Sequence, residues 1–216
     1  PMEAAREGIG ETDVMRGEEV LSLGLARRGH LPGGGMVLNL GSHWKAVRVD
    51  GAGRVESSVS TLAGEMLFAA RNQTILASSI PRGWPASLPG DWVAAGVRRG
   101  HADGWPRALY CVRLLEQRTL SSPEDRLAFL VGAAIAANEE ALVASCGPDR
   151  PRVVLSGAPA LMEAWGRVLR ERGLDPALLD DKEREAAFRT GCRAVLAAGT
   201  LESSPGDGHA YWRPPR

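Results

Sequence analysis

The chain has 216 residues, 44% of them hydrophobic, and its 26 basic side chains are balanced by 26 acidic ones. This length can bury one good core or two small ones, and the composition is that of a soluble globular protein. Because nucleic acids and anionic membranes are normally met by an excess of clustered lysine and arginine, the zero formal charge argues against both partners and favours a small-molecule substrate.

The cysteines and histidines give no sign of a disulfide framework or a metal site. Cys111, Cys146 and Cys192 are an odd number and are widely spaced, which predicts buried, reduced thiols in an intracellular, cytoplasmic protein. The four histidines form no i, i+4 pair and have no cysteine partner, so no metal-ligand set is expected. The most apolar stretch, residues 127–137, is short and flanked by charge, which predicts a core helix rather than a membrane span.

The first quarter of the chain predicts a helix followed by three strands. Apolar periodicity indicates an amphipathic helix over residues 15–28, with Glu18 and Glu19 in its first turn. A turn at Asp50–Gly53 separates the second strand from the third. Strands joined so closely form an antiparallel meander, and they are expected over residues 35–41, 43–50 and 54–60.

The rest of the chain is a helical block and then an alternation of strands and helices. The helical block runs over about 62–147 and ends at Gly147-Pro148. Strands followed by crossover helices predict an α/β fold, a mixed sheet with helices on its faces. The elements expected after the block are a strand at 152–157, a helix at 158–173, a short β segment at 174–179 and a helix at 184–199.

Three places could carry chemistry, and each also has a purely structural interpretation. Glu18 at a helix start would stay ionised and accept a proton, although acidic residues are common at helix starts in general. In the turn between the first two strands, Gly41 would let a phosphate approach and Ser42 would add a donor, although any hairpin needs such a glycine. Lys45 could reach a phosphate, although a solvated strand lysine is more common.

The third place is the strand-to-helix turn at Ser156-Gly157-Ala158. Ligands of α/β proteins usually bind at this kind of position, although an ordinary turn would look the same. The sequence contains no GxGxxG, P-loop or GxSxG motif, so it predicts no Rossmann, Walker or hydrolase site.

Taken together, the order of seven segments resembles that of the 2-dehydro-3-deoxygalactonokinases, bacterial sugar-acid kinases of the actin/hexokinase/Hsp70 fold. The resemblance extends over most of the chain and corresponds to the C-terminal portion of that family. The segments are VMRGEEVLSLG, NLGSHWKAVRVD, STLAGEMLF, AGVRRG, FLVGAAIAAN, VVLSGAPALMEAW and AAFRTGCRAV.

The resemblance implies a C-terminal ribonuclease-H-like domain over residues 15–201, with the helical insertion inside it. Residues 1–14 would end a preceding domain or linker, and residues 202–216 would form a flexible tail. The family's first phosphate hairpin, of the Asp-x-Gly-[Ser/Thr] type, does not occur here, so about one domain of the family, roughly 100 residues, is expected to be absent from this chain. A fragment of this kind would be inactive alone and would allow a homo-oligomer through its uncovered apolar face.

The resemblance also implies site residues. RGEE lies where related carbohydrate kinases carry a Gly-Asp-Gln motif with the general base, which points to Glu18 as that base, with Arg16, Gly17 and Glu19 around the substrate. Arg16 is our candidate for the sugar-acid carboxylate, with pairing to Glu19 as the alternative. The nucleotide-binding residues would be Gly41, Ser42, His43, Lys45, Gly64, Glu65, Ser156, Gly157 and Ala158, and the role of the pair Gly64-Glu65 is left open.

The reaction implied is the transfer of a phosphoryl group from ATP, with Mg²⁺, to 2-dehydro-3-deoxy-D-galactonate, which gives the 6-phosphate in galactonate catabolism. Two alternatives stay open. The first is a kinase for another sugar or sugar acid, and the second is a non-catalytic module that binds nucleotide.

Overall fold

A five-stranded mixed sheet lies at the centre of the protein, in a computed structural model that describes residues 9, 12–144 and 152–201. The strand order is β3-β2-β1-β4-β5. The first three strands pair antiparallel as the predicted meander, and β4 and β5 add to β1 in parallel. The strands are β1 (Gly35–Leu40), β2 (Trp44–Val49), β3 (Val55–Thr61), β4 (Arg152–Gly157) and β5 (Pro176–Leu178).

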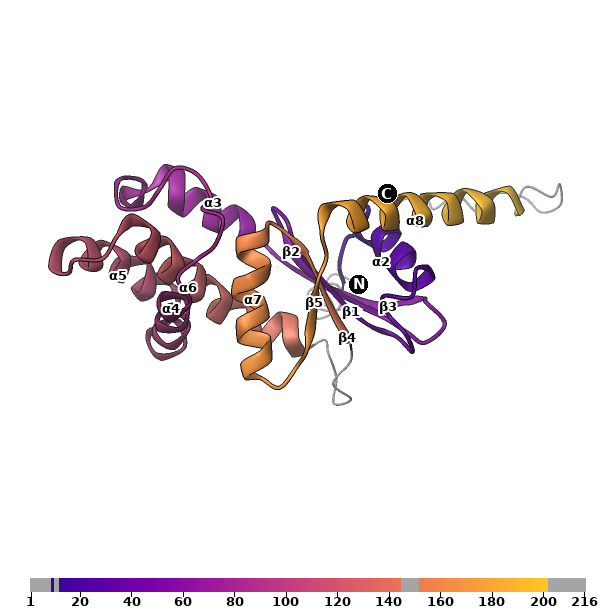
Figure 1. Ribbon diagram of the computed structural model, residues 1–216, viewed down its shortest axis with the longest axis horizontal. Helices are drawn as coiled ribbons and strands as arrows, with labels where there is room; N and C mark the ends of the chain where they lie inside the picture. The colour runs from indigo at the N-terminus through magenta and orange to yellow at the C-terminus, as the bar shows by residue number, and fades with distance from the viewer. Residues whose placement is uncertain (1–8, 10–11, 145–151, 202–216) are drawn as a thin grey trace, which may run out of the picture.

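Helices cover both faces of the sheet, which confirms the predicted α/β architecture (Figure 1). On one face lie α2 (Glu18–Arg27) and α8 (Asp181–Leu201), and on the other α6 (Pro123–Ala144) and α7 (Pro159–Glu171). Strand side chains alternate between two separate buried clusters. Both faces of the central strands β1, β2 and β4 are therefore mostly buried, whereas the edge strand β3 is partly exposed.

The predicted helical insertion lies between β3 and β4 and projects to one side of the sheet (Figure 1). It consists of α3 (Ala63–Gln73), η2 (Ile75–Ser78), α4 (Gly90–Asp103), α5 (Trp105–Arg118) and α6. The expected end of the insertion at Gly147-Pro148 lies outside the described residues, as do Cys146 and the tail at 202–216.

The helix α6 is longer than its apolar stretch suggested. It has 22 residues and is long and apolar enough to cross a membrane by length and composition alone, which corrects the expectation that no such stretch exists. In the structure 61% of its most apolar window is buried, and the helix packs against α4 and α5. The burial agrees with the predicted role of α6 as a core helix.

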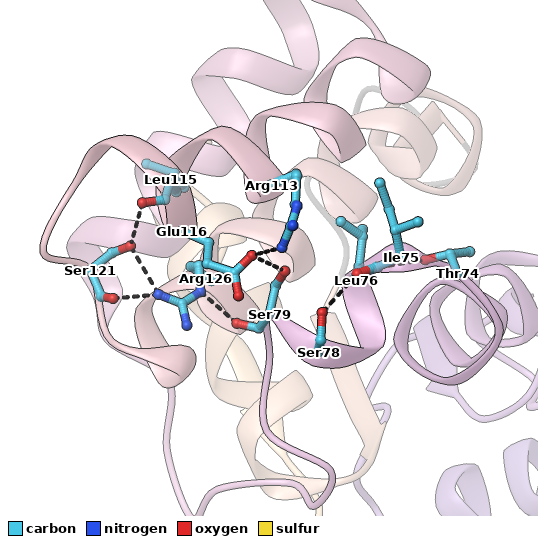
Figure 2. Close-up of polar contacts among 10 residues, drawn as sticks. All are labelled: Thr74, Ile75, Leu76, Ser78, Ser79, Arg113, Leu115, Glu116, Ser121 and Arg126. Carbon is cyan, nitrogen blue, oxygen red and sulfur yellow. Dashed lines mark hydrogen bonds and ion pairs between the residues drawn. The ribbon is translucent and has the colours of Figure 1, made fainter.

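A polar clamp fixes the outer part of the insertion (Figure 2). The buried guanidinium of Arg126 on α6 donates to the backbone carbonyls of Ser79 and Ser121. The Ser79 hydroxyl donates to Glu116 on α5 at 2.8 Å, and Glu116 also pairs with Arg113. The clamp joins the end of η2 to α5 and α6.

The two described cysteines, Cys111 and Cys192, are free thiols. Each is only partly buried, so the expectation of buried thiols is wrong for this pair.

Candidate active site

The two turns predicted to bind nucleotide leave the same edge of the sheet. In the parallel pairing of β1 with β4, Leu40 lies opposite Gly157 and Asn39 opposite Ser156. The β1–β2 turn, Gly41 to His43, therefore begins beside the β4–α7 turn at Ser156 to Ala158. The Ser156 hydroxyl itself is fully buried and has no hydrogen-bond partner in the described structure, so it does not face an open cavity.

The pair Gly64-Glu65 docks the start of α3 onto the β1–β2 turn. A Cβ on Gly64 would lie 2.1 Å from the carbonyl oxygen of Gly41 and 2.4 Å from that of Ser42, so no side chain fits there. The Glu65 N–H donates to the Ser42 carbonyl at 2.8 Å, and the Glu65 carboxylate lies 2.9 Å from Nε2 of His43. In the structure this pair therefore holds the start of α3 against the β1–β2 turn.

A cavity of about 430 Å³ opens beside this docked turn. Its walls are largely apolar, and Arg71 stacks on the indole of Trp84 at 4.3 Å. The same guanidinium donates to the three carbonyls of residues 81–83, directly before Trp84. The aromatic walls were not predicted, because Trp84 lies in an irregular Pro/Gly/Trp-rich connection. The cavity is lined by Leu40, Gly41, Ser42, Gly64, Glu65, Leu67, Phe68, Arg71 and Trp84.

Glu18 is the first residue of α2, and its geometry is set by the residues around Gly17. Gly17 caps the helix with φ +114°, a conformation that suits glycine. Glu19 folds back and accepts the Gly17 N–H at 2.8 Å, while Oε2 of Glu18 accepts the Arg16 N–H at 2.7 Å. The two carboxylates thus tie down the start of the helix, and that of Glu18 is held on the sheet side.

Lys45 meets Glu18 from the sheet. Across the strands, Ser156, Asn39, Lys45 and Ser60 form one row on the face covered by α2 and α8. Lys45 is only 3% exposed, and its Nζ lies 3.1 Å from Oε2 of Glu18 and 2.5 Å from the carbonyl of Val14. The solvated strand lysine considered from the sequence is therefore wrong.

The surroundings keep the Glu18 carboxylate ionised. Partial burial raises the pKa of Glu18, but hydrogen bonds from the Arg16 N–H and the Lys45 ammonium outweigh it, so the pKa lies below the ordinary 4.5. Burial likewise raises the pKa of Asp13, and the hydroxyls of Ser58 and Ser60 outweigh it, so this pKa lies below 3.8. Both groups are carboxylates at neutral pH.

Two cavities, of about 500 and 510 Å³, adjoin Glu18, and both are lined by Glu18 and Arg16. The first also reaches Asn39 and the start of α8, and the second reaches His43 of the β1–β2 turn. Glu18 can therefore exchange a proton with a molecule that lies close to the turn. The exposed Arg16 has no ion-pair partner in the described part of the chain, so the alternative pairing with Glu19 is not present.

The contribution of α8 to the first cavity had no signal in the sequence. Its lining residues follow Glu18 by more than 160 positions, and only the packing of α8 against α2 brings them to the site. They are Asp181, Arg184, Glu185 and Phe188.

The residues of the site do not fit a metal ion held by the protein. Within the described ranges, no group of three or more His, Cys, Asp and Glu side chains is arranged to bind one. Asp13 and Glu18 already accept hydrogen bonds from the protein. Magnesium in kinases is commonly bound through substrate phosphates and water, which requires no such group.

A solved structure is similar to this chain over most of the chain's length. The chain shares 27% identity and a TM-score of 0.70 with the crystal structure of a candidate 2-dehydro-3-deoxygalactonokinase from Sinorhizobium meliloti. The match covers 86% of this chain and 60% of that one, so the chain spans somewhat over half the length of this relative. A search of functionally curated proteins gave no match.

The sequence family described as 2-keto-3-deoxy-galactonokinase matches residues 3–195, which is most of the chain. The predicted resemblance is thereby confirmed, and the chain belongs to the 2-keto-3-deoxy-galactonokinase family.

Proposed function

We propose that this chain is the part of an ATP-dependent kinase that activates the acceptor hydroxyl of 2-dehydro-3-deoxy-D-galactonate and yields its 6-phosphate, a step of galactonate catabolism in the cytoplasm. Family membership supports a carbohydrate kinase that uses ATP. The observation that carries the proposal is the ionised Glu18 carboxylate, which adjoins a cavity reaching His43 of the predicted phosphate turn.

In this proposal Glu18 acts as general base. It accepts the proton of the terminal hydroxyl while that oxygen forms a bond to the γ-phosphorus and the bond between the γ-phosphorus and the oxygen of the leaving ADP breaks. A base with a pKa below neutrality is ready to accept a proton at physiological pH, although a low pKa also makes it a weak base. Transfer is therefore favoured late, when the hydroxyl has become acidic through its bond to phosphorus.

The nucleotide would occupy the cavity of about 430 Å³ beside the turn. Backbone N–H groups around Gly41 and Ser42 would face the phosphates, and the approach of α3 at Gly64-Glu65 fixes the shape of the turn. The adenine ring of the nucleotide would lie against the apolar walls of this cavity. Magnesium would arrive bound to ATP, and the steps proposed here use only residues of the chain.

The sugar acid would bind beside Arg16. A guanidinium matches a planar carboxylate in shape and charge, and Arg16 is exposed in both cavities that adjoin Glu18. Gly17 and Glu19 would act by holding the turn that presents Arg16 and Glu18.

We also propose a ribonuclease-H-like fold for the sheet domain. An antiparallel meander extended by parallel strands, with helices on both faces, supports this assignment. Catalysis would then need a second domain that supplies another phosphate hairpin and closes the cleft. The part of the Sinorhizobium meliloti protein that this chain does not match leaves length for such a domain in that relative.

The test is a substrate panel assayed by ADP release, using the full-length gene product. The panel contains 2-dehydro-3-deoxy-D-galactonate, its gluconate epimer, other sugar acids and neutral sugars. The proposal predicts the highest kcat/KM for the galactonate derivative. A higher value for another sugar acid would change the substrate, and ATP binding without turnover on any member would favour a non-catalytic nucleotide-binding module.

A further inference from the structure

Lys45 is buried beside the proposed base and contacts two protein acceptors. Its Nζ is within hydrogen-bond distance of the Val14 carbonyl and of Oε2 of Glu18, and the side chain is 3% exposed. A phosphate-binding lysine keeps its ammonium open to the ligand. The ammonium of Lys45 instead forms an ion pair with Glu18.

The sheet holds the ammonium group in place. Lys45 lies on the central strand of the meander, between Asn39 on β1 and Ser60 on β3. A buried charge is tolerated when it is paired and hydrogen-bonded, and both partners of Lys45 are themselves fixed near the start of α2. The strand register therefore places Lys45 below the start of α2, and the two acceptors hold Nζ there.

The contacts of the Glu18 carboxylate with other residues fall on one oxygen, while its own backbone N–H also donates to the carboxylate. Oε2 accepts from the Arg16 N–H and pairs with Lys45. Oε1 receives no hydrogen bond or ion pair from another residue in the described part of the chain. One oxygen is thus anchored to the protein, and the other is available to a bound molecule.

We propose that Lys45 is a positioning residue of the reaction, which anchors Oε2 of Glu18 so that Oε1 is the atom that takes the proton from the acceptor hydroxyl. This inference rests on the proposed function, in which Glu18 is the base. The O–H bond of the substrate breaks as the proton moves to Oε1, and the electron pair of the oxygen forms the new bond to phosphorus as ADP leaves.

The charged neighbours of Glu18 give the inference a pH signature. Lys45 forms an ion pair with Glu18, whereas the other charged groups line the adjoining cavities, except Glu19, which accepts the Gly17 N–H. Without the ammonium, partial burial and the nearby acidic groups would raise the pKa of Glu18. These other groups are Arg16 and Glu19 at the start of α2, Asp13 before it, His43 in the β1–β2 turn, and Asp181, Arg184 and Glu185 on α8.

The first test is the pH dependence of kcat/KM for Lys45→Met in the full-length gene product. The acid limb of this pH profile should move to higher pH by about one unit. The kcat/KM should therefore fall about tenfold at pH values below the limb and by less above it. The KM for ATP should stay the same in Lys45→Met. The conservative variant Lys45→Arg should recover part of the lost kcat/KM. The control variant Lys182→Met, at the exposed second lysine, should match the wild type. An equal loss at every pH, or a raised KM for ATP with an unmoved limb, would overturn the proposal.

The second test needs no turnover and covers the case in which Lys45→Met folds poorly. The chain has two lysines, so ¹³Cε-lysine labelling gives two signals from it, which Lys45→Arg assigns. In Glu18→Gln the buried ammonium loses its counter-charge, so the ¹³Cε chemical shift of Lys45 at neutral pH should differ from that of the wild type, while that of Lys182 should be the same. An unchanged Lys45 chemical shift would refute the pairing. Retained turnover by Glu18→Gln would instead refute the base and leave the pairing intact.

Discussion

Arg16 is the residue at which substrate selectivity can be tested separately from catalysis. Its side chain is exposed in both cavities next to Glu18 and makes no ion pair with a described residue. We expect Arg16→Ala to raise the KM for the sugar acid by about tenfold or more, because a charge-assisted hydrogen bond contributes about 1.5–3 kcal/mol. The KM for ATP should change much less.

Initial-rate kinetics with each substrate varied in turn measures this difference. Arg27→Ala is the matched control, since Arg27 is an exposed arginine at the other end of α2 and outside both cavities. Equal increases in the two KM values would remove Arg16 from carboxylate recognition.

At the residue scale, the sequence located Glu18 but not the partner that fixes it. A carboxylate after glycine at the start of an amphipathic helix is a local pattern, visible in the chain itself. The contact with Lys45 depends on the register of β2 and on how α2 lies on the sheet, and neither follows from local spacing. For the same reason the sequence left Gly64 unexplained, although its backbone contact with Gly41 excludes any side chain.

At the element scale, the polar clamp on Arg126 should carry much of the stability of the outer insertion. Arg126→Met removes a buried cation that satisfies the carbonyls of Ser79 and Ser121. We expect the free energy of unfolding to fall by about 2 kcal/mol, since hydrogen bonds to charged groups contribute about 1.5–3 kcal/mol. Amide protons of η2 should also exchange faster.

Denaturant unfolding together with hydrogen exchange measures this effect. Arg118→Met, at the exposed end of α5, should stay within about 0.5 kcal/mol of the wild type. If Arg126→Met also changed the free energy of unfolding by less than about 0.5 kcal/mol, the apolar core of the insertion would stabilise it without the clamp.

The elements themselves followed closely from the periodicity of the sequence. Alternating and apolar runs predicted β1 to β4, and β5 lies inside the short β segment predicted at 174–179. The predicted helices correspond to α2, α7 and α8, and the predicted helical block corresponds to α3 to α6. One boundary differs: α2 begins at Glu18 rather than near Met15, because Gly17 takes a left-handed conformation. How the insertion packs, and which helices share a face of the sheet, depends on contacts between residues far apart in the chain.

At the scale of the whole molecule, the two site carboxylates link folding to pH. The pKa values of Asp13 and Glu18 are lower in the folded protein than their ordinary 3.8 and 4.5, so the unfolded chain binds protons more readily. Their contribution to the free energy of unfolding is therefore complete above about pH 5 and is lost as the pH falls through the folded pKa values.

Thermal unfolding between pH 3 and 6 should show this loss. Asp13→Asn and Glu18→Gln should each flatten the acid slope, whereas Glu163→Gln, at an exposed position of α7, should keep the wild-type slope. Unaltered slopes in both site variants would mean that neither carboxylate is held ionised by the fold.

The most direct test of the account is phosphoryl transfer by Glu18→Gln, followed by ³¹P NMR on the full-length gene product with ATP and 2-dehydro-3-deoxy-D-galactonate. The wild type and Glu163→Gln should form a new phosphate ester and ADP. Glu18→Gln should be slower by about a hundredfold or more, because it cannot accept the proton, while it still binds ATP almost as tightly. A wild-type rate of ester formation by Glu18→Gln would contradict the account.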